Sequence, residues 1–154
     1  MVIFGAGSIG LVALVVALDE GAASVSVVEP NPSRRAQALK FGAIQAVESA
    51  ADLDADSYDI TLDASGNAGA IADAIRILGK RGRLIQMGVA APDATIDFRP
   101  LDLFEKEISL IGAQSMANMY PAAAERMGKL YDKLDELVTG TFPMERYEEA
   151  LEAR

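Results

Sequence analysis

Short apolar runs alternate with longer stretches of helical periodicity along most of the chain. Strands are expected where aliphatic and β-branched residues form brief runs, at Val2–Phe4, Val25–Glu29, Ile44–Val47, Asp59–Asp63, Arg83–Met87 and Ile108–Ile111. Helices are expected between or after these strands, at Ile9–Leu18, Pro32–Phe41, Ala68–Ile77 and Pro121–Leu137. Strands that alternate with helices in this way predict an α/β fold with a parallel sheet.

The most economical arrangement of these elements is a doubly wound, six-stranded parallel sheet of the Rossmann type, with strand order 3-2-1-4-5-6. Local signals agree, because Asn31 can cap the helix that begins at Pro32 and Gly42 can end it. The stretch from Gly79 to Gly82 is expected to separate a helix from a strand. Such sheets bind ligands at the carboxyl ends of their strands.

The turn between the first strand and the first helix carries three spaced glycines, Gly5, Gly7 and Gly10, with Ser8 and Ile9 between the last two. The first glycine permits the tight bend, the second lets the backbone approach a pyrophosphate, and the third lets helix and strand pack closely. The phosphates would lie at the helix N-terminus, where unpaired N–H groups and the helix dipole favour negative charge. The turn therefore predicts a dinucleotide-binding site.

An acidic residue ends the second expected strand. Glu29 stands about 20 residues past the glycine turn, the interval expected for the residue that binds the adenosine ribose. A carboxylate there accepts hydrogen bonds from both ribose hydroxyls and repels a 2′-phosphate, which favours NAD over NADP. Arg34 and Arg35 follow closely and are able to pair with a 2′-phosphate, so NADP stays an alternative.

Composition narrows the classes of function. The 154-residue chain has a formal net charge of −9, and it contains neither histidine nor cysteine. An acidic chain without a basic stripe is not expected to bind nucleic acid, and one without these two residue types has no disulfides, thiolate chemistry or zinc site built from thiolates and imidazoles. The early apolar stretch is too short to cross a bilayer and lacks a preceding positive charge, so we expect a cytoplasmic protein without a membrane partner.

The expected elements resemble the cofactor-binding half of the medium-chain, zinc-type alcohol dehydrogenases. The resemblance runs nearly from end to end of the chain. It is carried by the segments Val2–Leu11 (VIFGAGSIGL), Glu29–Ala43, Asp59–Gly66 (DITLDASG), Gly82–Gly88 (GRLIQMG), Glu107–Ala113 (EISLIGA) and Phe142–Ala150 (FPMERYEEA).

The resemblance also implies roles that spacing alone does not indicate. Glu29 and Arg34 would hold the adenosine ribose of the cofactor. Ser65 and Gly66 would line the cofactor cleft. Three residues at strand ends would present backbone groups to the nicotinamide carboxamide: Met87, Gly88 and Ala113.

Members of that family carry a preceding barrel-like domain that supplies Cys, His and acidic ligands to a catalytic zinc. No such residues precede the first strand here, so residues 1–154 are expected to form only the dinucleotide-binding domain, with zinc confined to the intact enzyme. The intact enzyme would transfer hydride between an alcohol, such as a polyol, and the nicotinamide, whereas the isolated chain is not expected to turn over. The resemblance further implies a homodimer joined through the edge of the sixth strand.

Two other interpretations stay open from the residues. A methyltransferase that uses S-adenosylmethionine also places a glycine turn and a later acid around an adenosine, although its first strand commonly ends in an acid where Phe4 stands here. A nucleotide-binding module without chemistry of its own would keep the turn and lack the zinc ligands. The ligand that binds, NADH, NADPH or S-adenosylmethionine, separates these interpretations.

Overall fold

The computed structural model describes residues 1–114 and 118–153. The chain divides into two units, the first described over residues 1–114 and the second over 118–153. Among the residues described, no helix combines the length and the apolar character needed to cross a bilayer.

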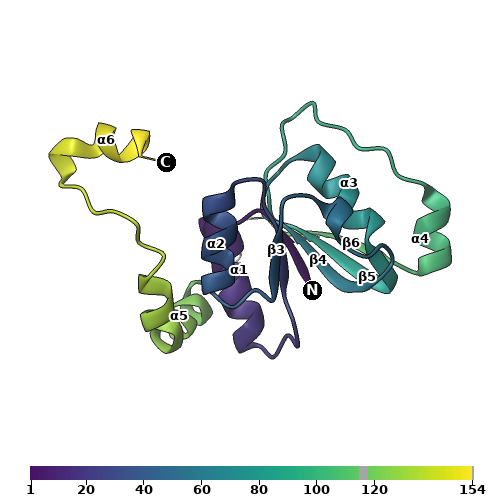
Figure 1. The fold of residues 1–154 in the computed structure, drawn as a ribbon, viewed down its shortest axis with the longest axis horizontal. Coiled ribbons are helices and arrows are strands. Elements are labelled where there is room, and N and C mark those ends of the chain that lie inside the picture. Colours follow the sequence, from purple (N-terminus) through teal and green to yellow (C-terminus); the bar gives the residue numbers. More distant parts are fainter. Residues whose placement is uncertain (115–117, 154) are drawn as a thin grey trace. The chain divides into compact units, whose positions relative to one another are not determined.

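The first unit is built on a parallel sheet of six strands in the order β3-β2-β1-β4-β5-β6, which confirms the predicted fold (Figure 1). Because β1 pairs with both β2 and β4, the strand order reverses beside the carboxyl end of β1. The strands are β1 (Val2–Phe4), β2 (Ser26–Val28), β3 (Gln45–Val47), β4 (Tyr58–Asp63), β5 (Leu78–Gln86) and β6 (Ser109–Gly112).

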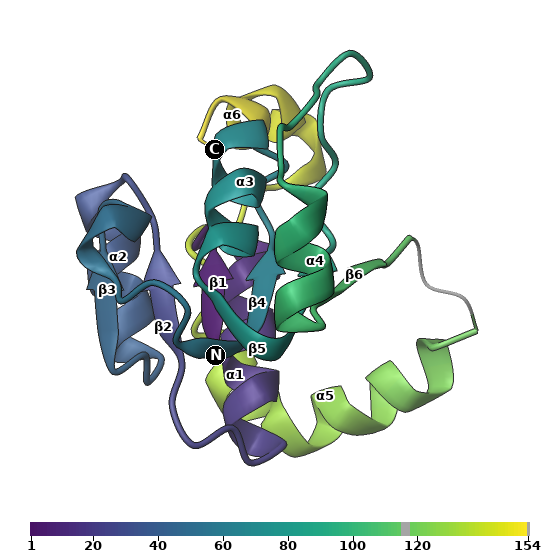
Figure 2. The same ribbon diagram turned by 90° about the vertical axis from the view of Figure 1, so that its right-hand side faces the viewer.

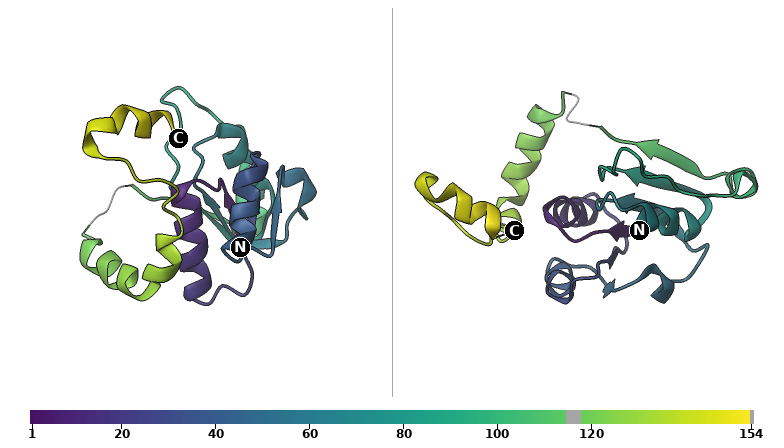
Figure 3. Two further views of the ribbon diagram at one scale, coloured as in Figure 1. Left: turned by 60° about the vertical axis from the view of Figure 1, so that its left-hand side comes forward. Right: turned by 90° about the horizontal axis from the view of Figure 1, so that it is seen from above.

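Helices cover both faces of this sheet. On one face lie α1 (Ser8–Asp19) and α2 (Pro32–Lys40), and on the other lie α3 (Ala68–Arg76) and α4 (Pro100–Lys106) (Figures 1 and 3). Figure 2 shows α3 and α4 in front of the strands. The predicted bounds of α1, α2 and α3 agree with the structure to within one residue at each end.

The core explains why the central strand is apolar throughout. Val2, Ile3 and Phe4 are all buried, because β1 is covered by helices on both faces of the sheet. Ile71 and Ile75 of α3 pack with the β1 side chains on one side. The sheet therefore holds its carboxyl ends in fixed positions around the glycine turn that follows β1.

The stretch from Gly79 to Gly82 lies inside β5, so the prediction that it separates a helix from a strand is wrong. Tyr58 pairs with Leu78, whereas Ile60 pairs with Arg83, so the extra residues of β5 form a bulge against β4. A Cβ on Gly82 would lie 3.0 Å from the carbonyl oxygen of Tyr58, so the bulge leaves almost no room for a side chain there. The glycines belong to the bulge in β5 and do not separate α3 from the strand.

The second unit contains α5 (Tyr120–Asp135), the 3-10 turn η2 (Met144–Arg146) and α6 (Tyr147–Glu152). The helix predicted at Pro121–Leu137 corresponds to α5. The sequence did not predict α4, α6 or the short 3-10 turn η1 (Ala50–Asp52) in the first unit. These elements are too short for apolar periodicity to reveal them.

Candidate functional site

A cleft of about 570 Å³ opens at the carboxyl ends of the central strands, where the strand order reverses. This is the position at which doubly wound sheets bind ligands. Residues from the ends of β1 to β4 and from α2 and α3 line it, among them Gly5, Gly7, Glu29, Pro30, Arg34, Glu48, Ser49, Ala64, Ser65, Asn67 and Asp73.

Each of the three positions in the β1–α1 turn is a glycine for a different structural reason. Gly5 adopts a φ of 98°, which side chains disfavour. A Cβ on Gly10 would lie 1.9 Å from the carbonyl oxygen of Gly5, so α1 approaches the turn too closely for any other residue. A Cβ on Gly7 would meet no atom within 4 Å, so this glycine leaves free space beside the backbone at the cleft. That space is what a bound phosphate group would need.

The N-terminus of α1 has no side-chain cap. The first intrahelical bond runs from the N–H of Leu11 to the carbonyl oxygen of Gly7, at 2.9 Å. By contrast, the Asn31 side chain caps α2 and the Asn67 side chain caps α3. The first N–H groups of α1 are thus available to an anion in the cleft, where the helix dipole adds to the attraction.

The Glu29 carboxylate connects the glycine turn to the end of β2. Its Oε2 accepts the N–H of Ala6 at 2.8 Å, and its Oε1 accepts the N–H of Asn31 at 2.9 Å. The residue is only 6% exposed and still lines the cleft. Because each carboxylate oxygen has two lone pairs, both oxygens keep an acceptor position after these bonds are made. Glu29 is therefore able to bind ribose hydroxyls while it fixes the turn.

Asp63 organises the loop after β4, and sequence reasoning missed it as part of the site. The residue is fully buried, and its Oδ1 accepts the N–H of Ser65 at 2.9 Å, the hydroxyl of Ser65 at 2.6 Å and the N–H of Gly66 at 3.2 Å. An acid that bonds to the backbone two residues further on is a common turn device, so the sequence Asp-Ala-Ser-Gly was the available signal. Asp63 shapes the wall of the cleft without lining it.

The structure brings together only part of the predicted cofactor-binding set. Gly5, Gly7, Glu29, Arg34 and Ser65 all line the cleft. Sequence reasoning missed other residues that share this lining, four in the connections that follow β2, β3 and β4 and one within α3: Pro30, Glu48, Ser49, Asn67 and Asp73.

Gly66 and Gly88 lie against each other between the ends of β4 and β5. A Cβ on Gly66 would lie 2.3 Å from the carbonyl oxygen of Val89, and a Cβ on Gly88 would lie 2.2 Å from the nitrogen of Gly66. Both positions therefore require glycine for packing. Gly10 has the same kind of role in the first turn.

Ser8, Ile9 and Met87 line a separate, mainly apolar groove of about 450 Å³ beside α1. The N–H groups of Met87 and Gly88 both donate to the carbonyl oxygen of Asp63 at 2.9 Å, and the N–H of Ala113 donates to Gln86 at 2.9 Å. The backbone groups that these three residues would offer to a carboxamide are therefore their carbonyl oxygens. The predicted contact with a nicotinamide stays a prediction.

Within residues 1–114 and 118–153, no three His, Cys, Asp or Glu side chains come together in a group able to hold a metal ion. The acids that line the cleft are held by other partners. Asp73 pairs with Arg76 at 3.2 Å, and Glu48 lies 3.7 Å from Arg35. The chemistry of this cleft is that of hydrogen bonding and charge.

Comparison of the sequence with known proteins gives consistent matches. The family model for zinc-binding dehydrogenases matches residues 8–129. D-altritol 5-dehydrogenase of Agrobacterium fabrum is 30% identical over 144 residues, which cover 92% of this chain and 43% of that protein. The chain thus spans less than half the length of this curated relative.

Solved structures share the fold. An alcohol dehydrogenase from Thermotoga maritima has a TM-score of 0.88 and 26% identity, over 98% of this chain and 45% of that one. A putative zinc-binding dehydrogenase from Sinorhizobium meliloti, bound to NADP, has a TM-score of 0.79 and 20% identity, over 83% of this chain and 41% of that one. At that identity, the second match shows the fold alone.

Proposed function

Because the chain belongs to the zinc-binding dehydrogenase family, we propose that residues 1–154 are the dinucleotide-binding domain of an alcohol dehydrogenase-like oxidoreductase and that they bind NAD(H). One observation carries the proposal. Gly7, which precedes the uncapped first turn of α1 and has no atom within 4 Å of a would-be Cβ, lines the same cleft as Glu29 at the reversal of strand order. These are the groups that a pyrophosphate and its neighbouring ribose need.

In the proposed complex, each group has a separate task. The first N–H groups of α1, at Gly7, Ser8 and Ile9, would bind the pyrophosphate, and Gly5 and Gly10 would keep the turn close to it. The Glu29 carboxylate, supported by Arg34, would bind the adenosine ribose. When bound, the nicotinamide accepts hydride in its oxidised form and donates hydride in its reduced form.

The other half of the cofactor would lie toward the ends of β4, β5 and β6. Ser65 and Gly66 would line the cleft on the side of β4. The carbonyl oxygens of Met87, Gly88 and Ala113 would accept hydrogen bonds from the carboxamide, since their N–H groups are already bonded. These assignments rest on the family resemblance together with the strand-end positions of the residues.

Charge supports NAD over NADP. Three carboxylates line the cleft, those of Glu29, Glu48 and Asp73, against the single guanidinium of Arg34. A 2′-phosphate would meet an excess of negative charge there, whereas ribose hydroxyls donate hydrogen bonds to carboxylates. The relative affinities of the chain for NADH and NADPH test this preference.

The intact enzyme would oxidise an alcohol or polyol, the substrate class that the name of the Agrobacterium fabrum relative suggests. A catalytic zinc in such an enzyme would polarise the alcohol oxygen. This sequence contains no Cys and no His, so we propose that ligands outside it hold that zinc and that residues 1–154 alone do not turn over.

We further propose a homodimer through β6. This strand lies at the edge of the sheet and pairs with β5 on its other side, and Leu110 and Ile111 are 42% and 44% exposed. Unpaired edge groups favour pairing with a second strand.

The cytoplasmic location also stays a proposal, and it rests on the sequence.

Titration of the purified chain with NADH, NADPH and S-adenosylmethionine tests the main proposal. Enhancement of nicotinamide fluorescence reports the first two ligands, and calorimetry reports the third. We expect NADH to bind most tightly. Binding of S-adenosylmethionine alone would reject the dehydrogenase assignment in favour of a methyltransferase.

A further inference from the structure

The two adjacent arginines of α2 are used differently. Arg34 is exposed and lines the cleft. The side chain of Arg35 is only 21% exposed, and its Nη1 donates to the carbonyl oxygens of Glu29 at 2.8 Å and Pro30 at 2.7 Å. Arg35 is therefore fixed on the connection between β2 and α2, while Arg34 is the arginine that faces a ligand.

Glu48, which directly follows β3, compensates the charge of Arg35. Its Oε2 lies 3.7 Å from Nη2 of Arg35. The end of β3 is held beside the end of β2, because the N–H of Glu29 donates to the carbonyl oxygen of Val47 at 2.9 Å. Glu48 follows Val47 directly, so the fold keeps this acid next to the proposed ribose position.

Of the three acids that line the cleft, Glu48 is the one whose side chain contributes least to holding the fold together. Its side chain is 73% exposed and lines the cleft together with Glu29 and Arg34. The Glu29 carboxylate is bonded to two backbone N–H groups, and Asp73 is bonded to Arg76. Removal of the Glu48 charge therefore changes the electrostatics of the cleft without dismantling a buried network.

We propose that Glu48 is a specificity-determining residue that disfavours a 2′-phosphate on the adenosine ribose. The inference rests on the proposed dinucleotide site. Glu48 acts in two ways: it compensates Arg35, the second cation near the ribose, and it adds its own negative charge to the cleft. A 2′-phosphate carries a charge of about −1.5 to −2 near neutral pH, so it is repelled, whereas a 2′-hydroxyl is not.

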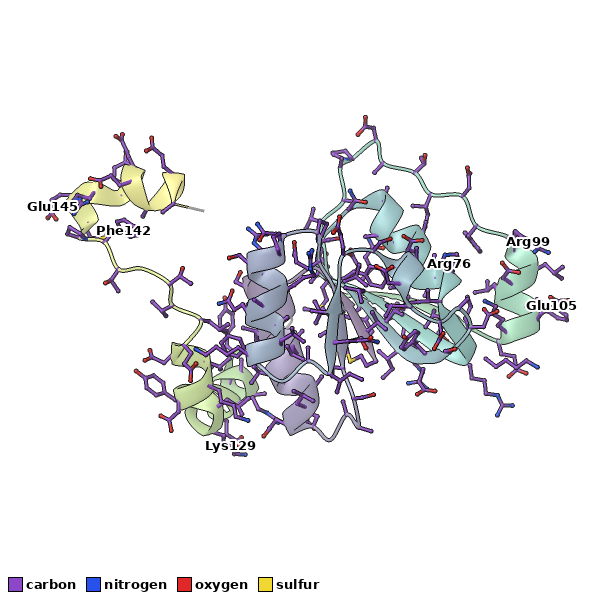
Figure 4. All side chains as sticks on the ribbon, viewed as in Figure 1. Arg76, Arg99, Glu105, Lys129, Phe142 and Glu145 are labelled. Carbon is purple, nitrogen blue, oxygen red and sulfur yellow. The ribbon has the colours of Figure 1, made fainter. Side chains whose placement is uncertain are left out.

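The test compares Glu48→Gln with a matched control, Glu105→Gln. Glu105 is an exposed acid on α4 that does not line the cleft (Figure 4). Each variant and the wild type are titrated with NADH and NADPH by fluorescence, and with ADP and 2′,5′-ADP by calorimetry. We expect Glu48→Gln to tighten NADPH and 2′,5′-ADP about three- to tenfold, with NADH and ADP changed less than about twofold.

Two further arms separate charge from folding. Glu48→Asp keeps the charge and is expected to keep the wild-type preference. Raising the ionic strength from about 0.05 to 0.5 M is expected to reduce the difference between Glu48→Gln and wild type, because the Debye length falls several-fold. Glu105→Gln is expected to leave all four affinities unchanged.

Two results would overturn the inference. One is a Glu48→Gln variant that leaves the ratio of the NADPH and NADH dissociation constants unchanged. The other is a Glu48→Asp variant that alters this ratio as much as Glu48→Gln does. A wild-type chain that binds neither NADH nor NADPH rejects the proposed function itself, so the two failures are distinguishable.

Discussion

The backbone N–H of Ala6 donates a hydrogen bond to Oε2 of Glu29 at 2.8 Å, across 23 residues of sequence. The bond joins the glycine turn to the end of β2. One carboxylate therefore fixes the shape of the proposed pyrophosphate site and also faces the proposed ribose site. Binding and local stability are consequently coupled through a single side chain.

Replacing Glu29 with Gln tests this coupling. The amide places an N–H₂ donor where an oxygen accepted the N–H of Ala6 or Asn31, which leaves a buried donor without an acceptor and costs about 1–3 kcal/mol of unfolding free energy. We expect a lower Tm and an NADH affinity weakened about tenfold or more. A variant that binds NADH as wild type does would contradict the ribose-binding role.

Gly7→Ala is expected to separate binding from folding. A Cβ at this position meets no protein atom within 4 Å, so the cost in stability should be limited to about 1 kcal/mol for the changed N-cap. The same methyl group would occupy the space proposed for the pyrophosphate, so the NADH affinity should fall at least about tenfold. Thermal unfolding and fluorescence titration measure the two effects.

Gly128→Ala provides the control for that substitution. Gly128 lies in α5, where a Cβ also meets no atom within 4 Å, and alanine favours a helix. Its NADH affinity should equal that of wild type. If Gly7→Ala behaves like Gly128→Ala in the titration, the glycine turn does not bind the pyrophosphate.

Asp63→Asn should loosen the loop after β4. The Oδ1 atom accepts hydrogen bonds from both the backbone and the hydroxyl of Ser65, and the residue is fully buried. Replacing one carboxylate oxygen with an amide group removes acceptor capacity there, at about 1–3 kcal/mol. Ser65→Ala removes the hydroxyl that donates to Asp63 and accepts the exposed N–H of Asn67 at 3.1 Å, and it should cost less because the Asp63 carboxylate keeps its backbone donors. Chemical denaturation of both variants checks this order, and the reverse order would contradict it.

Leu110→Lys should weaken the proposed dimer. A charged side chain on an edge strand opposes pairing with a second copy, so we expect the dimer dissociation constant to rise about tenfold or more. Leu103→Lys is the matched control, since Leu103 is similarly exposed at 37% but lies on α4. Sedimentation velocity over a range of concentrations measures both. A monomeric wild type at all concentrations would refute the dimer.

The sequence predicted the fold well because its signals are local or periodic. Val2–Phe4 was bounded correctly, since three buried aliphatic and aromatic residues before a glycine turn have few other structures available. Asn31 caps α2 as predicted, and Gly42 follows its end with a φ of 104°. Gly79 was misinterpreted because a bulge depends on the pairing of β5 with β4, which no local pattern reveals.

The candidate site could be predicted only in part from the sequence, because several of its contacts depend on how the strands pair. Spacing and resemblance identified Glu29, but its bond to Ala6 depends on the register that places Phe4 beside Val28. Asp63 was missed because its burial is a property of the assembled sheet. Glu48 was missed because it enters the cleft only when β3 pairs with β2.

The uncapped N-terminus of α1 has a consequence for the stability of the domain and its resistance to proteolysis. A helix that leaves its first amides to solvent gives up stabilisation that a capping side chain would provide, about 1 kcal/mol. Coenzyme bound at the proposed site would restore this contribution, and the free energy of unfolding would then rise with the logarithm of coenzyme concentration above the dissociation constant. The concentration of nicotinamide nucleotide would in this way determine how long the chain resists proteolysis, as well as what fraction of it carries coenzyme.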